Sequence, residues 1–249
     1  MPKIAWLTGA STGIGRAVAL RLAADGWRVA ASARNAGALA TLAAEAAPGT
    51  IASYPVDVTD RDACLACAER IERELGPLDL AIFNAGAHRP MPATEFSSAT
   101  LRALLDINVM GTAHGLEAVL PRLIARKSGR VVIVASMAGY RGLPTAAAYG
   151  ASKAALINMA EALRPELAMQ GVILQVVNPG FVKTPMTAQN RFPMPFLVTA
   201  EQAAAAILRG LRSDRFEITF PARFAFLMKL VRLIPDRIYF YFTRRIVAS

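Results

Sequence analysis

The sequence predicts a single doubly wound α/β domain, a three-layer sandwich in which helices cover both faces of a seven-stranded, mostly parallel sheet. Short apolar runs alternate with longer Ala- and Leu-rich segments of helical periodicity as far as residue 220, a pattern typical of parallel strands joined by crossover helices. A glycine-rich turn separates the first apolar run from the first helical segment. No linker interrupts the alternation, so we expect one domain over 1–221 and a basic, apolar helical extension over 222–249.

The first half of the chain is expected to contribute four strands and three helices. Each strand is a short apolar run, as expected for a strand that is buried on both faces. Pro48-Gly49 ends the second helix and Gly76-Pro77 ends the third, because these residues do not continue a helix. The strands are expected at 3–7, 28–33, 51–55 and 78–83, and the helices at 16–25, 35–47 and 61–75.

The second half repeats the alternation with longer helical segments. Asn108 falls inside the first of them, although Asn is a weak helix former. We therefore expect either a bent helix or water site at Asn108, or a buried amide whose hydrogen bonds are satisfied. His114, in the same segment, has no evident partner and is expected to be structural. The strands are expected at 130–135, 172–177 and 216–220, and the helical segments at 99–126, 149–170 and 200–211.

Composition limits the class of protein. The 249 residues are 54% hydrophobic, which is enough for a large core, and the formal net charge of +10 raises the question of an anionic partner. Cys64 and Cys67 stand in mid-helix without a second ligand pair, so we expect core or helix-face thiols and no metal site. The sequence shows no signal-peptide pattern and no run of roughly 20 apolar residues. A cytoplasmic protein is therefore expected.

The glycine-rich turn runs from Thr8 through Gly9, Gly13 and Gly15 immediately after the first strand and opens a helix. Strand, glycine turn and helix form the layout of a dinucleotide site. Glycines let the backbone approach a pyrophosphate closely, and the amino end of the helix favours its negative charge. The spacing is G-x-x-x-G-x-G rather than G-x-G-x-x-G, so an ordinary glycine-rich turn is the alternative.

Arg34 follows the second strand, at the point where a dinucleotide fold meets the adenosine ribose. An acidic residue there would hydrogen-bond the ribose hydroxyls of NAD, whereas an Arg can hold the 2′-phosphate of NADP. From Trp27 to Ala44 the chain has no Asp or Glu. We therefore expect NADP (NADPH) to be preferred, with NAD as the alternative. Asp57, after the third strand, is expected either to contact adenine or to begin the next loop.

Tyr149 and Lys153 stand four residues apart at the start of a predicted helix and so share one helix face. A nearby ammonium stabilises a phenolate and would lower the pKa of Tyr149 from about 10 towards a value useful for general acid–base catalysis. A solvated surface pair is the alternative. Ser136 ends the fifth strand, and the loop between it and Tyr149 contains glycines that let it fold back beside the strand end.

These motifs, in this order over about residues 3–220, resemble the classical short-chain dehydrogenase/reductase family, whose domain has a Rossmann-type fold. The resemblance rests on six features: Thr8-Gly9-x-x-x-Gly13-x-Gly15, Asn84-Ala85-Gly86, Asn108, Ser136, Tyr149-x-x-x-Lys153, and Pro179-Gly180 with Thr184.

The resemblance implies a catalytic set of Asn108, Ser136, Tyr149 and Lys153. Tyr149 would exchange a proton with the substrate oxygen, and Lys153 would lower the pKa of Tyr149 and bind the nicotinamide ribose. Ser136 would hold the substrate oxygen, and Asn108 would anchor a water that relays protons through Lys153.

The resemblance also implies a cofactor site along the carboxyl ends of the strands. Gly9, Gly13 and Ile14 would line the pyrophosphate and nicotinamide side, Asp57 and Val58 would frame adenine, and Thr184 would hold the carboxamide. The full set is Gly9, Ser11, Thr12, Gly13, Ile14, Gly15, Arg34, Asp57, Val58, Asn84, Ala85, Gly86, Tyr149, Lys153, Pro179, Gly180, Val182 and Thr184. NADP-preferring relatives often carry a basic residue where this chain has Thr12, so the expectation of NADP rests mainly on Arg34.

Two apolar segments lie outside these motifs. The lid, 185–199, is rich in apolar residues (Met186, Phe192, Met194, Phe196 and Leu197), which suits an apolar substrate unless they only pack onto the domain. The extension 222–249 is expected to form two helices, 222–234 and 236–247. In the second, Ile238, Tyr239, Phe240, Phe242 and Ile246 form an apolar side, and Arg237, Arg244 and Arg245 lie towards the other.

Basic residues beside exposed apolar ones suit an anionic membrane surface and a neighbouring subunit about equally. Nucleic acid is not expected, because the extension has no base-reading motif. The resemblance further implies a homodimer or homotetramer. From the composition and the basic extension, we expect a location in the cytoplasm or peripherally on the inner face of a membrane.

The expected function is that of an NAD(P)-dependent oxidoreductase. The specific expectation is an NADPH-dependent carbonyl reductase, or secondary-alcohol dehydrogenase, that acts on an apolar, lipid-like alcohol or ketone through Tyr149. The alternative is a non-catalytic nucleotide-binding sensor or scaffold. The presence of all four catalytic residues argues against this alternative.

Overall fold

The computed structural model describes residues 2–189 and 193–248. One seven-stranded sheet forms its centre, in the order β3-β2-β1-β4-β5-β6-β7. A mostly parallel sheet was expected, and all six strand pairings are parallel. The strands are β1 (Ile4–Thr8), β2 (Arg28–Ser32), β3 (Ile51–Ser53), β4 (Leu80–Phe83), β5 (Arg130–Val134), β6 (Ile173–Pro179) and β7 (Glu217–Phe220).

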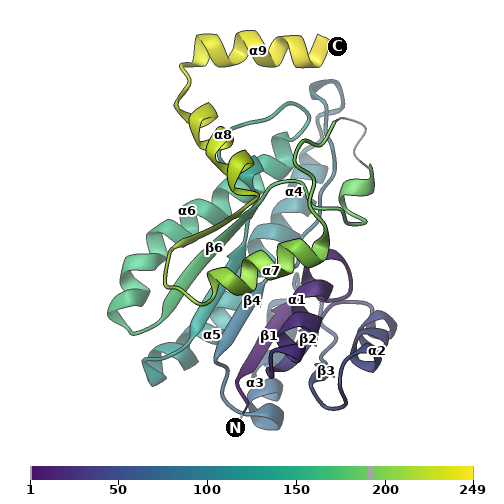
Figure 1. The fold of residues 1–249 in the computed structure, drawn as a ribbon, viewed down its shortest axis with the longest axis vertical. Helices are drawn as coiled ribbons and strands as arrows, with labels where there is room; N and C mark the ends of the chain where they lie inside the picture. The colour runs from purple at the N-terminus through teal and green to yellow at the C-terminus, as the bar shows by residue number, and fades with distance from the viewer. Residues whose placement is uncertain (1, 190–192, 249) are drawn as a thin grey trace.

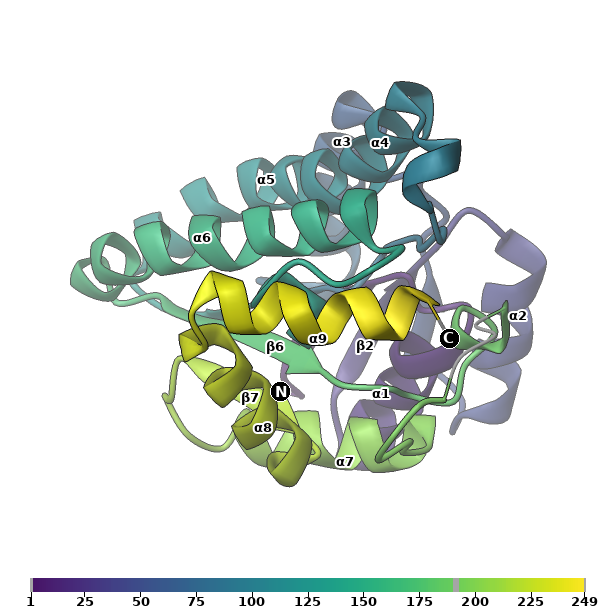
Figure 2. The same ribbon diagram turned by 90° about the horizontal axis from the view of Figure 1, so that it is seen from above.

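Helices cover both faces of the sheet (Figures 1 and 2). One layer holds α1 (Gly13–Ala24), α2 (Ala36–Glu45) and α7 (Ala200–Gly210), and the other holds α3 (Arg61–Leu75), α4 (Ser98–Leu105), α5 (Gly111–Arg126) and α6 (Ala147–Met169). Successive strand residues face opposite layers. Trp6 packs edge-to-face on Phe83, with ring centroids 5.9 Å apart, towards α3 and α5. Leu7 joins the cluster under α1 and α7. The predicted three-layer fold is confirmed.

The segment 99–126, expected as one helical region, is divided. A π-helical turn, Asp106–Met110, separates α4 from α5. Asn108 lies at its centre and is fully buried. π-helical turns occur as local bulges in helices, often at functional sites. The regular α-helix is therefore interrupted at Asn108, the position that the sequence singled out.

Two other sequence interpretations concern thiols and a histidine. Cys64 and Cys67 are free and buried, as expected of core thiols. Burial raises the pKa of Cys64 to about 12, which keeps the thiol protonated and unreactive. His114, expected to be structural, has a partner that the sequence did not indicate, because its Nδ1 lies 3.0 Å from the carbonyl oxygen of Val58. That contact crosses 56 positions of sequence and could not be inferred from local pattern.

The extension forms two helices, α8 (Ala222–Leu233) and α9 (Asp236–Ala248). α8 follows β7 and packs Phe224 and Met228 against Met137, which follows β5. α9 projects at one end of the molecule, beyond α8 (Figure 1). Within the described ranges, no helix has the length and apolar character needed to span a bilayer.

Candidate active site

The carboxyl ends of the parallel strands meet at one edge of the sheet, where open α/β folds bind ligands. A pocket of about 340 Å³ opens there. Most of the predicted cofactor residues line it, namely Gly9, Ser11, Thr12, Gly13, Ile14, Arg34, Asp57, Val58, Asn84, Ala85, Gly86 and Thr184.

The glycine turn brings the backbone close to its neighbours. Gly9 has φ +68°, and a Cβ there would lie 2.7 Å from the Cα of Ala85. A Cβ at Gly15 would lie 2.2 Å from the carbonyl oxygen of Gly9. The N-cap residue Thr12 makes no side-chain capping bond to α1, so the first amides of the helix can face an anionic ligand. These features fit a dinucleotide pyrophosphate.

Asn84 fixes the turn to the end of β4. Its Nδ2 donates to the carbonyl oxygens of Thr8 and Gly9 at 3.2 and 3.1 Å. In return, the hydroxyl of Thr8 accepts hydrogen bonds from the backbone amides of Asn84 and Ala85. Asn84 therefore both lines the pocket and holds its glycine wall in place.

Several predicted cofactor residues do not line the pocket. Gly15 is a packing residue against Gly9, and a Cβ at Gly180 would lie 2.7 Å from Phe224 of α8. Val182 is buried and forms a β-bridge with Val198. Pro179 is the last residue of β6. Tyr149 and Lys153 are not among the residues that line the pocket.

The sequence interpretation missed some lining residues: Ala33, Asn35, Val56, Ala87, Ile107 and Pro185. Most are sequence neighbours of predicted ones, and extending each motif by one residue would have found them. Of the lid residues that the structure describes, Pro185 and Met186 alone line the pocket. Phe196 packs instead near Phe224, with ring centroids 5.9 Å apart, and Phe192 lies outside the described residues.

One end of the pocket is bounded by Arg34 and Asp57. The backbone amide and hydroxyl of Thr59 donate to Asp57, and these hydrogen bonds, with a smaller contribution from the charge of Arg34, hold the pKa of Asp57 below its usual value. Asp57 thus begins the loop before α3, one of the two roles expected for it. No acidic side chain of the described residues forms an ion pair with Arg34.

Tyr149 lies on the first turn of α6 in apolar surroundings formed by Met91, Leu104 and Ala148. The ring of His88 packs edge-on against it, with centroids 4.6 Å apart. Burial raises the pKa of Tyr149, while a hydrogen bond with Ser136 acts in the opposite direction. The structure therefore differs from the expected lowering by Lys153, because burial dominates.

Lys153 is buried one turn further along α6. Its Nζ donates to the carbonyl oxygen of Val134 at 2.9 Å and lies 5.7 Å from the centroid of the Tyr149 ring. Burial lowers the pKa of Lys153 to about 8. A Cβ added at Gly86, in the pocket wall, would lie 3.6 Å from this Nζ. Lys153 therefore reaches the pocket from behind Gly86.

Asn108 connects the loop after β4 with α6. Its Oδ1 accepts from the amide of Ala87 at 2.7 Å, and its Nδ2 donates to the carbonyl oxygen of Ala87 and to Ser152 Oγ. Ser152 in turn donates to the carbonyl oxygen of Tyr149 at 2.7 Å. The side chain of Asn108 is thus a satisfied buried amide, and it positions the backbone that carries Tyr149.

Comparison with known proteins agrees with this geometry. The sequence profile of the short chain dehydrogenase family matches residues 3–194. The chain belongs to the short-chain dehydrogenase family. It is 39% identical over 246 residues to an uncharacterized oxidoreductase of Myxococcus xanthus, covering 98% of this chain and 97% of that protein.

Two solved structures of short-chain dehydrogenases resemble the fold closely. One, from Burkholderia cenocepacia in complex with NADP, has a TM-score of 0.83 and 27% identity, with 96% of each chain covered. The other, from Burkholderia phymatum in complex with NAD, has a TM-score of 0.85 and 25% identity, with 92% of each chain covered. The protein is therefore a short-chain NAD(P)-dependent dehydrogenase/reductase with a nicotinamide nucleotide cofactor.

The low pKa of Lys153 predicts how the stability of this short-chain dehydrogenase depends on pH. Between about 8 and the unfolded value near 10.4, the unfolded chain holds a proton on Lys153 that the folded chain has lost. The contribution of Lys153 to stability therefore increases with pH across that window. The free energy of unfolding can be measured in urea for the cofactor-free wild type and Lys153→Met at pH 7.5 and 9. Relative to the variant, wild type should be more stable at pH 9 than at pH 7.5.

The comparison with the variant removes the effect of groups common to both proteins, such as Cys64. An equal pH dependence in wild type and Lys153→Met would show that Lys153 titrates as an ordinary exposed lysine.

Proposed function

We propose that this protein is an NADPH-dependent carbonyl reductase in which Tyr149 is the proton donor. The observation that carries this proposal is the phenol of Tyr149, which is partly buried, hydrogen-bonded with Ser136 and close to Lys153, in a chain whose neighbouring pocket fits a dinucleotide. When bound, the nicotinamide supplies a hydride to the carbonyl carbon.

The direction of the pKa shift favours reduction. Burial raises the pKa of Tyr149, so the phenol is protonated at neutral pH and available to give its proton to the carbonyl oxygen as negative charge develops there. The hydroxyl of Ser136, which is hydrogen-bonded with Tyr149, would hold the same oxygen. A positive Lys153 beside the ring stabilises the phenolate left after proton transfer.

The preference for NADPH is supported by Arg34 and by the chemistry of its end of the pocket. The guanidinium can bind a phosphate with two parallel hydrogen bonds. Asp57, the acidic residue of this lining, is occupied by Thr59. The ribose hydroxyls of NAD would therefore meet a cation rather than a free carboxylate.

An apolar ketone is proposed as the substrate because Tyr149 packs against the apolar side chains of Met91, Leu104 and Ala148. The turnover of a series of methyl ketones of increasing chain length should test this. We expect kcat/KM to rise by up to about fourfold with each methylene buried, from roughly 0.8 kcal/mol per methylene. A constant or falling kcat/KM would contradict an apolar site, and turnover of none of the ketones with tight NADPH binding would favour the sensor function.

The proposed catalytic domain is 1–221, with 222–249 as an extension that also supports the site. Phe224 of α8 stacks on Phe181, with ring centroids 5.6 Å apart, beside the loop that carries Thr184. The family resemblance supports a homodimer or homotetramer as the assembled, cytoplasmic enzyme, which the molar mass from light scattering would test.

A further inference from the structure

α8 has one buried face and one exposed apolar face. Phe224, Ala225 and Met228 face the domain. On the other side, Phe226, Leu230 and Leu233 recur at i, i+4 and i+7 and so form a stripe along the helix. Phe226 is 67% exposed and Leu233 is 78% exposed. Contiguous exposed apolar side chains on a folded helix mark an interaction surface.

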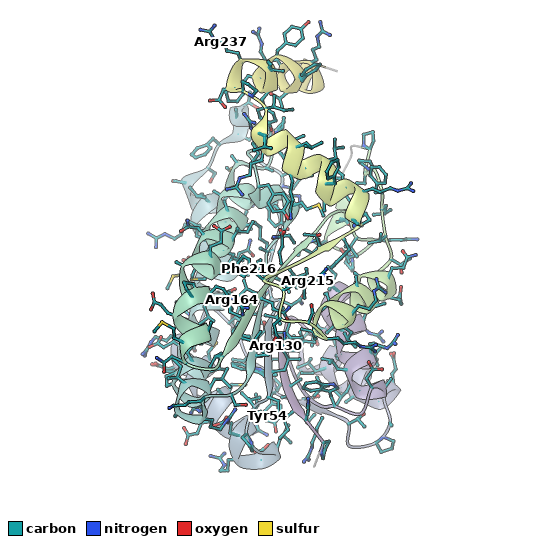
Figure 3. All side chains as sticks on the ribbon, turned by 60° about the vertical axis from the view of Figure 1, so that its left-hand side comes forward. Tyr54, Arg130, Arg164, Arg215, Phe216 and Arg237 are labelled. Carbon is teal, nitrogen blue, oxygen red and sulfur yellow. The ribbon has the colours of Figure 1, made fainter. Side chains whose placement is uncertain are left out.

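α9 continues this surface with aromatic and basic side chains. Ile238, Phe240, Tyr241 and Phe242 are all about half exposed. Arg237, in the first turn of α9, points away from the body of the molecule (Figure 3). The side chain of Ile246, predicted for the same apolar side, lies outside the described residues. We call the exposed side chains of α8 and α9 the C-terminal platform.

The platform is anchored to the domain at the joint between the helices. Arg141, in the loop that follows Ser136, donates to the carbonyl oxygens of Val231 and Ile234 at 2.7 and 2.5 Å. It also pairs with Asp236 at 2.8 Å, and its guanidinium stacks 3.9 Å from the ring centroid of Tyr239. The platform is therefore a built part of the fold.

The charge of the platform indicates which kind of partner it binds. Residues 222–249 contain six basic side chains and one acidic side chain, and that acid, Asp236, is already paired with Arg141. Among the described residues, no acidic side chain forms an ion pair with Arg223, Arg232, Arg237, Arg244 or Arg245. Two platforms facing each other in a symmetric dimer would bring like charges together, and the rest of the chain is also net positive, because the whole chain carries +10.

We propose that the C-terminal platform docks the protein onto the surface of a bilayer that contains anionic lipids. Exposed Phe, Leu and Ile side chains would enter the headgroup boundary while the Arg side chains contact lipid phosphates, which is the chemistry of an interfacial helix. α8 begins directly after the carboxyl end of β7. The docked face is therefore at the same edge of the sheet as the nucleotide pocket. This docking does not depend on the proposed reduction.

Flotation of the full chain with phosphatidylcholine vesicles that contain phosphatidylglycerol tests the proposal. Wild type should float with these vesicles at low salt, much less at high salt, and not with pure phosphatidylcholine. Phe226→Ser/Leu230→Ser should lower the fraction floated at least about tenfold, from the apolar area removed. Arg237→Gln/Arg244→Gln should lower vesicle affinity about 25-fold, at about fivefold per charge.

Matched control variants lie at the opposite edge of the sheet. Met169→Ser removes an apolar side chain that is 86% exposed at the end of α6, and Arg73→Gln/Lys127→Gln removes two exposed charges. Both should float like wild type, and circular dichroism should show every variant folded. The proposal would be overturned if the platform variants and the control variants floated to the same extent, or if wild type did not float at low salt. The proposal would also be overturned if wild type did not float and instead formed an oligomer that the substitutions Phe226→Ser/Leu230→Ser dissociate. The platform would then bind a second copy of the chain.

Discussion

Tyr149→Phe is expected to lower kcat for ketone reduction by about 10²- to 10⁴-fold, the usual contribution of a positioned general acid. The variant keeps the buried ring and its packing against His88 and loses only the hydroxyl that bonds with Ser136. NADPH binding, measured by fluorescence titration, should remain within a fewfold of wild type. Consumption of NADPH with an apolar ketone gives the rate.

Tyr54→Phe is the matched control. Tyr54 is also buried, and its hydroxyl donates to Glu74 on α3, outside the nucleotide pocket (Figure 3). We expect the control to reduce ketones at the wild-type rate. A Tyr149→Phe enzyme with wild-type kcat would show that another group donates the proton.

Arg34→Asp is expected to change the ratio of kcat/KM for NADPH to that for NADH by at least about a hundredfold. The substitution removes charge-assisted hydrogen bonds to the 2′-phosphate, each worth roughly 1.5–3 kcal/mol, and adds a repelling carboxylate. The same carboxylate can accept hydrogen bonds from the ribose hydroxyls of NADH. Steady-state kinetics with both cofactors and one ketone measures the ratio.

Arg16→Asp separates this effect from a general loss of positive charge. Arg16 also lies near the glycine turn, but it pairs with Glu45 of α2 and does not line the nucleotide pocket. We expect it to leave the cofactor ratio near that of wild type. If Arg34→Asp left the ratio unchanged as well, the preference for NADPH would not depend on Arg34.

Local patterns were sufficient to predict the strands, most of the helices and most of the residues that line the nucleotide pocket. A parallel strand buried on both faces needs a short apolar run, and a crossover helix needs a longer periodic one. The helix 61–75 was predicted with the bounds that the structure shows for α3. The glycine turn was recognisable because close backbone approach excludes a Cβ there.

Long-range contacts account for what the sequence did not reveal. The sequence left open whether Asn108 marks a bend, a water site or a satisfied buried amide, because the partners of its side chain, Ala87 and Ser152, come from two other segments. Burial raises the pKa of Tyr149, and the residues that bury it come from separate segments of the chain. No local sequence pattern therefore indicates the direction of this shift. The anchoring of the extension by Arg141 crosses more than 90 positions and was equally hidden.

Single-turnover reduction of an apolar ketone tests the central claim most directly. Wild type and Tyr149→Phe are loaded with equal amounts of NADPH and mixed with the ketone, and the alcohol is quantified by mass spectrometry. We expect wild type to form one secondary alcohol for each NADPH consumed, while Tyr149→Phe keeps its NADPH reduced over the same time. Equal alcohol yields and rates from both proteins, or bound NADPH that wild type never spends on any ketone, would contradict Tyr149 as the proton donor of a carbonyl reductase.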